Sequence, residues 1–324
     1  MTPFAQPERL RPAALRPGDT VGIIAPAGVI DSDALEAGCA WLMRKGLQPF
    51  YLPSILDREL YFAGSAKRRL DEFHEMFSRP EIKAIICARG GYGCNYLLPH
   101  IDLNLVRANP KIFCGCSDVT TLLMYLCDRA EMVSFHGPML NVDVRPDGID
   151  DESWLAALTA GKAYQRDFGS DEVQTLVPGS AEGMLYGGCL SLLCASLGTP
   201  YEIETRGTVL FLEDVAEPAF RIDRMLMHLK LAGKFEGVRG VIFGEMLQCG
   251  PRNGEDYTLQ QVVQRVVGAL GIPVAYGLKS GHVSRANITL PMGVFARLSA
   301  GATVTLGFDA AVRAKREPIA VPKS

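Results

Sequence analysis

The chain has 324 residues, of which 48% are hydrophobic and 21% charged, and its formal net charge is −3 at neutral pH. This composition excludes a disordered chain, a collagen-like repeat and a coiled coil. At about 150 residues per domain, the length predicts two domains. A near-neutral chain without a basic run also argues against nucleic acid or an anionic membrane as the main partner, because both select clustered Lys and Arg. We expect a small-molecule partner.

The sequence offers no convincing membrane or export signal. Its longest mostly apolar stretch, 266–278, is interrupted by Gly and Pro and falls short of the roughly 18 residues that a membrane span requires. Glu8, Arg9 and Arg11 lie where a secretory signal needs an apolar core. We therefore expect a cytoplasmic protein. The nine cysteines are an odd number without C-x-x-C spacing, which favours reduced, packed thiols over disulfides or a zinc site.

Strand-like and helical segments alternate from residue 20 onward. The apolar run 20–25 predicts a buried strand. Apolar residues at helical spacing between Asp31 and Gly46 predict the helix that follows it. The same alternation continues with strands at 47–52, 83–88 and 111–115, a helix over 70–77 that Ser65 caps, and a short helical segment at 95–98. This pattern predicts a parallel sheet with helices on both faces, whose ligands bind at the carboxyl ends of the strands.

The regular alternation fades between Asn141 and Ser180, where Asp, Gly and Pro accumulate and only 154–158 indicates a short helix. We interpret 146–180 as an interdomain connection between an N-terminal domain, 1–145, and a C-terminal domain, 181–324. The second half is mixed α and β. Its expected elements are a Gly-rich β segment at 183–188, helices at 190–197, 222–229 and 259–270, strands at 208–212, 238–243 and 273–278, and a hairpin-like tail at 287–306.

A serine stands where the predicted strand 111–115 gives way to a helix. Ser117 lies in this turn, and a tight strand-to-helix turn pushes its side chain out of the fold beside amides that can stabilise an oxyanion. The segment meets the nucleophile-elbow pattern G-x-S-x-G only in part, because Val119 replaces the last glycine. The alternative is that Ser117 or Asp118 merely caps the helix.

Glu213 and His282 are candidates in the second half of the chain. Glu213 directly follows an apolar strand, where a carboxylate marks either a functional rim or an expensive burial. His282 follows the predicted strand 273–278 and a glycine, on a flexible loop that could reach across domains. Together with Ser117, they give a serine, an acid and a histidine in that chain order, each just after a predicted strand, and these fill the three roles of an acyl-transfer triad. His136 either lines a cleft or satisfies a buried backbone group.

The glycine-rich segment Arg89–Gly93 lacks the third glycine of a dinucleotide fingerprint and has no Walker lysine. A nucleotide site is therefore disfavoured. The segment instead offers close backbone approach to a substrate and N–H donors near the serine turn. The alternative is an ordinary tight turn.

These segments occur together in one known family, and the chain resembles the LD-carboxypeptidases of the S66 serine peptidase class. The matching stretches are 24–27, 61–64, Arg89–Gly93, Gly115–Asp118, His136–Pro138, Leu212–Asp214 and Ser280–His282. The resemblance implies Ser117 as the nucleophile, Glu213 as the acid and His282 as the base. It also implies an N-terminal flavodoxin-like domain, a C-terminal swivelling β/β/α domain, a site in the groove between them and a homodimer.

The resemblance further implies an activity, namely removal of the terminal D-alanine from peptidoglycan tetrapeptides during cell-wall recycling. Backbone amides near Gly91 and Asp118 would hold the oxyanion, and Arg89 is the candidate for the substrate carboxylate. Neither a metal nor a cofactor is expected. The sequence does not distinguish diaminopimelate from lysine at the third peptide position, nor a free peptide from a muropeptide.

Three rival functions remain open at the level of sequence. A microcin C-type self-immunity hydrolase would keep the triad and cleave aminoacyl-nucleotides, but Trp41 and Trp154 are the only tryptophans available to stack a base. A catalytically idle protein that binds cell-wall peptides would lack turnover altogether. Cysteine chemistry would use Cys116 with His136.

Overall fold

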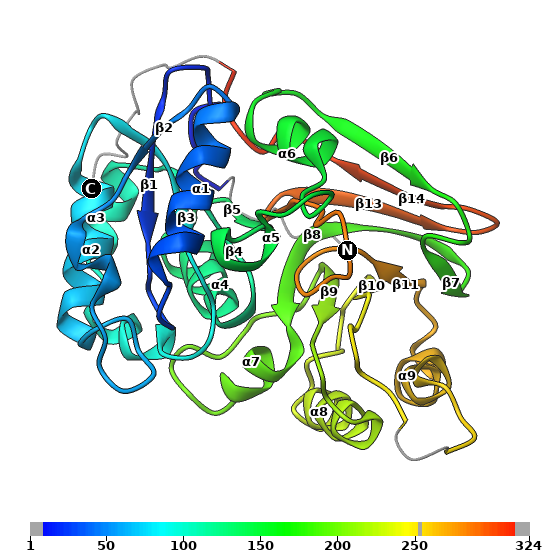
Figure 1. The fold of residues 1–324 in the computed structure, drawn as a ribbon. Helices are drawn as coiled ribbons and strands as arrows, with labels where there is room; N and C mark the ends of the chain where they lie inside the picture. The colour runs from blue at the N-terminus through cyan, green and yellow to red at the C-terminus, as the bar shows by residue number, and fades with distance from the viewer. Residues whose placement is uncertain (1–8, 252–254, 315–324) are drawn as a thin grey trace.

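A computed structural model describes residues 9–251 and 255–314, which form two β-sheets flanked by helices (Figure 1). In Figure 1 the N-terminal half, coloured blue to cyan, lies on the left, and the C-terminal half, coloured green to orange, lies on the right. The order of elements confirms the expected α/β class. It also shows how the two halves meet.

The N-terminal sheet has the strand order β12-β5-β4-β3-β1-β2. Its strands are β1 (Thr20–Ile24), β2 (Gln48–Phe50), β3 (Ile82–Cys87), β4 (Ile112–Gly115), β5 (Ser134–His136) and β12 (Leu290–Met292). The strands β1 to β5 run parallel, in the flavodoxin-like order 2-1-3-4-5. In such a sheet, ligands bind where the strand order reverses, which here is between the carboxyl ends of β1 and β3.

The helices of this half are α1 (Ser32–Arg44), α2 (Ala66–Ser78), α3 (Leu103–Ala108), α4 (Thr120–Arg129) and α5 (Leu140–Asp143). The predicted cap of α2 is confirmed, since the Ser65 side chain accepts a hydrogen bond from the Arg68 amide. Asp31 caps α1 in the same way through the Ala34 amide. Right-handed crossovers put α1 on one face of the sheet and α2, α3 and α4 on the other.

The C-terminal sheet has eight strands in the order β6-β14-β13-β8-β9-β10-β11-β7. They are β6 (Tyr164–Phe168), β7 (Gln174–Val177), β8 (Gly179–Cys189), β9 (Thr208–Glu213), β10 (Gly240–Gly244), β11 (Val274–Leu278), β13 (Phe295–Ala300) and β14 (Val304–Phe308). Its central strands β8 to β11 are parallel and its outer strands antiparallel. The helices are α6 (Asp151–Leu158), α7 (Leu190–Ala195), α8 (Ala219–Leu231) and α9 (Leu259–Val267).

Two segments differ from the sequence-based expectation. The predicted connection 146–180 contains the expected short helix, α6, but it also contains β6 and β7, which form the two edges of the C-terminal sheet. Their polar, half-exposed residues suit edge strands, which is why they resemble a linker in sequence. The predicted hairpin tail is divided: β13 and β14 pair with each other, whereas β12 crosses over and pairs antiparallel with β5 of the N-terminal sheet.

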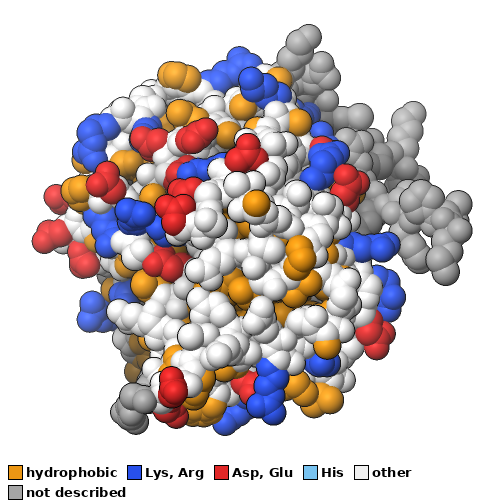
Figure 2. Space-filling view, turned by 90° about the vertical axis from the view of Figure 1, so that its right-hand side faces the viewer, with side chains coloured by type: hydrophobic (Ala, Val, Ile, Leu, Met, Phe, Trp, Pro, Cys, Tyr) orange, Lys and Arg blue, Asp and Glu red, His pale blue; other side chains and the backbone are white. Residues whose placement is uncertain are grey.

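The surface carries charges of both signs. On the face shown in Figure 2, Lys and Arg side chains are interspersed with Asp and Glu, and the centre of the face is mainly uncharged. Within residues 9–251 and 255–314, no helix combines the length and the apolarity that crossing a membrane requires. Seven of the nine cysteines are buried, and all nine are free thiols.

Candidate active site

Ser117 occupies a turn that few non-glycine residues adopt. It follows β4, starts a short 3₁₀ turn over Ser117–Val119 and has a φ of 60°, in the left-handed region. Helix α4 begins directly afterwards at Thr120. A strained backbone between a strand and a helix is the geometry of a nucleophile elbow, because it holds the side chain clear of the fold.

The glycine-rich loop after β3 packs directly on this turn. A Cβ on Gly90 would lie 2.7 Å from the Cβ of Ser117, 2.9 Å from its Oγ and 3.4 Å from the Asp118 amide nitrogen. The Gly90 carbonyl accepts a hydrogen bond from the Gly28 amide at 2.8 Å, which joins this loop to the loop after β1. The serine turn therefore packs against the loops that frame the switch point of the sheet, and only glycine at position 90 leaves enough room beside the hydroxyl.

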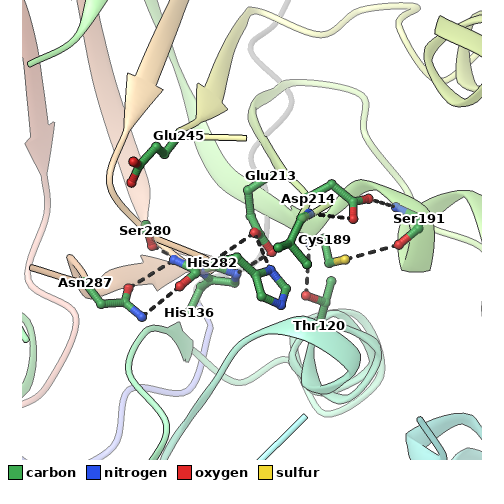
Figure 3. A network of polar contacts seen from close by, with 12 residues as sticks. Thr120, His136, Cys189, Ser191, Glu213, Asp214, Glu245, Ser280, His282 and Asn287 are labelled. Carbon is green, nitrogen blue, oxygen red and sulfur yellow. Dashed lines mark hydrogen bonds and ion pairs between the residues drawn. The ribbon is translucent and has the colours of Figure 1, made fainter. Parts of the chain in front are cut away.

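The carboxyl edge of the C-terminal sheet supplies a carboxylate and an imidazole that are already paired. Glu213 ends β9 and is fully buried. Its Oε2 accepts hydrogen bonds from the His282 ring at Nδ1, 2.8 Å, and from the His282 backbone amide at 3.1 Å (Figure 3). The Nδ1 contact leaves Nε2 of His282 as the nitrogen that can act as a base.

The pairing shifts the pKa values of both groups. Burial alone raises the pKa of Glu213, but the charge and hydrogen bond of His282, together with the nearby ring of His136, more than offset it, so this pKa lies well below 4.5. Burial lowers the pKa of His282, but Glu213 outweighs burial and raises this pKa above 6.5. The pair is therefore arranged to hold a carboxylate next to an imidazole whose proton affinity is enhanced.

The loop that carries His282 is anchored, in contrast to the flexible loop expected from the sequence. Asn287 binds Gly281 on both sides: its Oδ1 accepts from the Gly281 amide and its Nδ2 donates to the Gly281 carbonyl, each at 3.0 Å. Gly281 has a φ of 92°, and a Cβ there would lie 2.6 Å from the Glu213 carboxyl carbon. The loop is thus fixed closely against the carboxylate.

Contacts across the two sheets bring this pair to the serine turn. His136, at the end of β5, lies with its Nε2 3.7 Å from Oε1 of Glu213. Thr120, which begins α4, accepts a hydrogen bond from the Cys189 amide at 3.1 Å, and Cys189 is the register partner of Glu213. Among the described residues, no hydrogen bond joins Ser117 to His282. The structure pairs the acid with the histidine and places both across the domain junction from the serine turn.

The remaining candidate residues are Asp118, Arg89 and Cys116, on or next to the serine turn and the glycine-rich loop. The Asp118 carboxylate accepts from the Cys94 amide at 2.8 Å and so anchors the glycine-rich loop, while its own amide lies beside Gly90. Arg89 is exposed and donates to the Val29 carbonyl at 2.8 Å. Cys116 is 1% exposed, and burial raises the pKa of its thiol well above 9.0, which opposes the thiolate that cysteine chemistry needs.

Sequence reasoning missed part of the site. It did not predict strand β5, which is only three residues long, and it left His136 between two roles. It gave no role to Ser280, Asn287 or Thr120. The only signal available was that His136 and Ser280 fall within two of the stretches that carry the family resemblance.

The comparisons with known proteins agree with this architecture. The family model "LD-carboxypeptidase N-terminal domain" matches residues 21–137, and "LD-carboxypeptidase C-terminal domain" matches residues 182–298. A probable murein peptide carboxypeptidase of Bacillus subtilis (strain 168) is 40% identical over 295 residues, which cover 89% of this chain and 91% of that protein. The chain belongs to the LD-carboxypeptidase family, peptidase family S66.

The chain is also similar to solved structures of two differently named proteins. The chain is similar to MccF in complex with glutamyl sulfamoyl guanosine, with a TM-score of 0.85 and 26% identity over 94% of this chain and 99% of that chain. It is also similar to the muramoyltetrapeptide carboxypeptidase from Oxalobacter formigenes, with a TM-score of 0.81 and 28% identity over 90% of this chain and 99% of that chain. Family membership makes this protein a hydrolase of the peptidase class and supports a carboxypeptidase role.

Proposed function

We propose that this protein is a cytoplasmic serine LD-carboxypeptidase that removes the terminal D-alanine from peptidoglycan tetrapeptides in cell-wall recycling, and that it works as a homodimer. The observation that carries the proposal is the pairing of the buried Glu213 with the partly exposed His282 at 2.8 Å, across the domain junction from the strained turn of Ser117. The names of the murein-peptide carboxypeptidases among its relatives support the substrate class.

The proposed chemistry is acyl transfer in two steps. His282 takes the Ser117 proton at Nε2 while Oγ attacks the carbonyl of the L-centred residue, and the resulting oxyanion is held by the amides of Gly91 and Asp118. The imidazolium returns its proton to the departing D-amine, leaving an ester on Ser117. Water, deprotonated by His282, then attacks the ester and releases the shortened peptide with Ser117 restored. Glu213 holds the ring tautomer and stabilises the cation in both steps.

Gly90→Ala is expected to reduce kcat/KM by about 10²-fold or more, because the added methyl would overlap Ser117 Cβ at 2.7 Å and displace the nucleophile. Gly301→Ala is the matched control, since its Cβ would meet nothing closer than 3.8 Å. Steady-state kinetics and a thermal unfolding curve of each variant separate misplacement from loss of fold. Near-normal activity of Gly90→Ala would contradict the tight placement of the serine turn.

We assign the substrate carboxylate to Arg89. Its Nη1 is engaged by the Val29 carbonyl at 2.8 Å, and the rest of the exposed guanidinium remains to bind an anion. We expect Arg89→Ala to raise KM about 10- to 100-fold with little change in kcat, as for loss of a charge-assisted hydrogen bond. Lys67→Ala, which removes an exposed cation paired with Asp71, is the control. An unchanged KM would exclude Arg89 from carboxylate binding.

A second substrate class is supported by a group of exposed tyrosines. The rings of Tyr61 and Tyr92 lie 6.2 Å apart and those of Tyr92 and Tyr96 6.0 Å apart, next to the glycine-rich loop. The two tryptophans, in contrast, pack against each other in the core. The aromatic surface that the sequence reasoning did not find is therefore supplied by tyrosines, and stacking a base is worth about 1–3 kcal/mol. This favours an aminoacyl-nucleotide as the alternative substrate.

The deciding experiment incubates the purified protein with a tetrapeptide ending in D-alanine, the same peptide ending in L-alanine, and an aminoacyl sulfamoyl nucleoside. Mass spectrometry of the products should show loss of one D-alanine from the first substrate only. Cleavage of the nucleoside alone, with sensitivity to Tyr92→Ala, would replace the peptidase proposal with the second one. Failure to cleave any of the three would favour a catalytically idle binding protein.

A further inference from the structure

A second buried histidine lies against the carboxylate of the proposed triad. His136 is 0% exposed, and the ring of Phe211 packs edge-on against it at 5.2 Å between centroids. Its Nδ1 is 3.0 Å from Oγ of Ser280, and its Nε2 is 3.7 Å from Oε1 of Glu213 (Figure 3). The mechanism above assigns His136 no part, although an imidazole in this place is expensive to bury.

The two carboxylate oxygens of Glu213 have different surroundings. Oε2 accepts both hydrogen bonds from His282. Oε1 has no hydrogen-bond partner within residues 9–251 and 255–314, and the same holds for Nε2 of His136. Because a buried acceptor without a donor costs free energy, each atom has the other as its natural partner. A movement of less than 1 Å would bring the pair to hydrogen-bond length.

Ser280 is placed to select the tautomer of the neutral His136 ring. Its buried hydroxyl can donate one hydrogen bond, and Nδ1 of His136 is the acceptor that lies within reach. A neutral ring that accepts at Nδ1 carries its proton on Nε2, which is the atom that faces Glu213. The Ser280 hydroxyl thus supplies the tautomer in which His136 donates to Oε1.

We infer that His136 is a positioning residue that holds Glu213 by its second oxygen and keeps the first oxygen aligned with Nδ1 of His282. This inference rests on the proposed roles of Glu213 and His282. His136 belongs to the N-terminal sheet and Glu213 to the C-terminal sheet, so the same contact fixes the acid relative to the domain that carries Ser117. The contact therefore sets the distance between base and nucleophile.

Loss of the His136 N–H donor should change the pKa of His282 in a direction that can be predicted. An N–H that points at a carboxylate stabilises its negative charge, so its removal makes Glu213 bind the imidazolium more strongly and raises the pKa of His282. The acidic limb of the rate profile should then move to higher pH. Within the described residues, the other titratable groups near this pair are Asp214 next to Glu213 on the chain, Asp143 of α5, Cys116 after β4, Cys189 of β8 and Cys249 after β10.

The test compares His136→Leu with His136→Gln in the full-length protein, by release of D-alanine from the tetrapeptide as a function of pH. His136→Leu should lower kcat about 10- to 100-fold, the range for losing a hydrogen bond to a charged group, with KM within about twofold and the acidic limb shifted upward. His136→Gln keeps an N–H donor and should recover most of the rate. Equal losses in both variants with an unmoved limb would reduce His136 to a packing role.

Two further variants keep the test decisive. If His136→Leu unfolds, Ser280→Ala, which no longer fixes the tautomer of His136, should shift the acidic limb of the pH–rate profile in the same direction. An unmoved limb overturns the inference.

A double-mutant cycle gives a second test. His136→Leu should cause no further loss of kcat in a Glu213→Gln background, because it acts through that carboxylate. Additive losses of kcat overturn the inference. Wild-type turnover by Ser117→Ala in the same assay would instead remove the proposed function, so the two failures are distinguishable.

Discussion

Replacement of Ser117 by alanine is expected to lower kcat for D-alanine release by about 10⁴-fold or more, the scale seen when the nucleophile of a serine hydrolase is removed. The reason is that Ser117 supplies the nucleophile that forms the acyl-enzyme, on which both steps of the proposed reaction depend, while binding and the oxyanion amides are left intact. Single-turnover measurement with the tetrapeptide checks the loss. Unchanged turnover would dismiss the triad and favour a different nucleophile, which inactivation by thiol reagents would then identify as a cysteine.

The stability of a Ser117→Gly variant provides an independent control for this prediction. Ser117 holds a φ of 60°, which costs a non-glycine residue on the order of 1 kcal/mol. Glycine adopts that conformation without the penalty, so this variant should be inactive yet at least as stable as the wild type. Chemical denaturation measures the difference in the free energy of unfolding. A less stable Ser117→Gly would show that the turn is not strained.

The N-terminal fold could be predicted because its local signals agree with its tertiary structure. Apolar runs predicted β1, β3 and β4. Asp31 caps the predicted helix α1, and Ser65 caps the predicted helix α2. Glycine-rich loops and the serine turn follow the strand ends that the pattern indicated.

Elements fixed by long-range pairing could not be predicted in this way. Strand β12 has three residues and belongs to the N-terminal sheet only because β5 pairs with it. Strands β6 and β7 are edges whose polar residues resemble a linker. In each case the deciding contact lies far away in sequence, where periodicity carries no information.

The candidate site likewise contains residues that local sequence patterns reveal and residues that only the tertiary structure brings together. Ser117, Glu213 and His282 each follow a strand that the sequence reveals, and the structure shows that Glu213 and His282 are paired. The partners that position them could not be found from spacing, because His136 approaches Glu213 from the other sheet and Ser280 approaches His136 across 144 positions. Only the assembled fold shows which buried polar atoms face one another.

Glu213→Gln should give the second large effect, a fall in kcat of about 10³- to 10⁴-fold together with a shift in pH dependence. The amide keeps the shape of the carboxylate but neither fixes the Nδ1–H tautomer of His282 nor stabilises its cation. In the wild type, kcat/KM requires neutral His282, so the rate should rise with pH around a midpoint above 6.5. Without the charge of Glu213, burial lowers the pKa of His282 against only the smaller effects of Asp214 and Asp143, so the midpoint should move to lower pH than in the wild type.

Stability measurements provide the matching control for Glu213→Gln. The depressed pKa of Glu213 means that its contribution to stability is present above about pH 4.5 and is lost as the pH falls. The raised pKa of His282 means that its contribution is present below about pH 6.5 and is lost as the pH rises through the folded-state value. The wild type should therefore exceed Glu213→Gln in unfolding free energy most clearly between these limits. A difference that is the same from pH 5 to pH 9, with an unmoved acidic limb, would show that the ion pair does not form and that the rate loss has another cause.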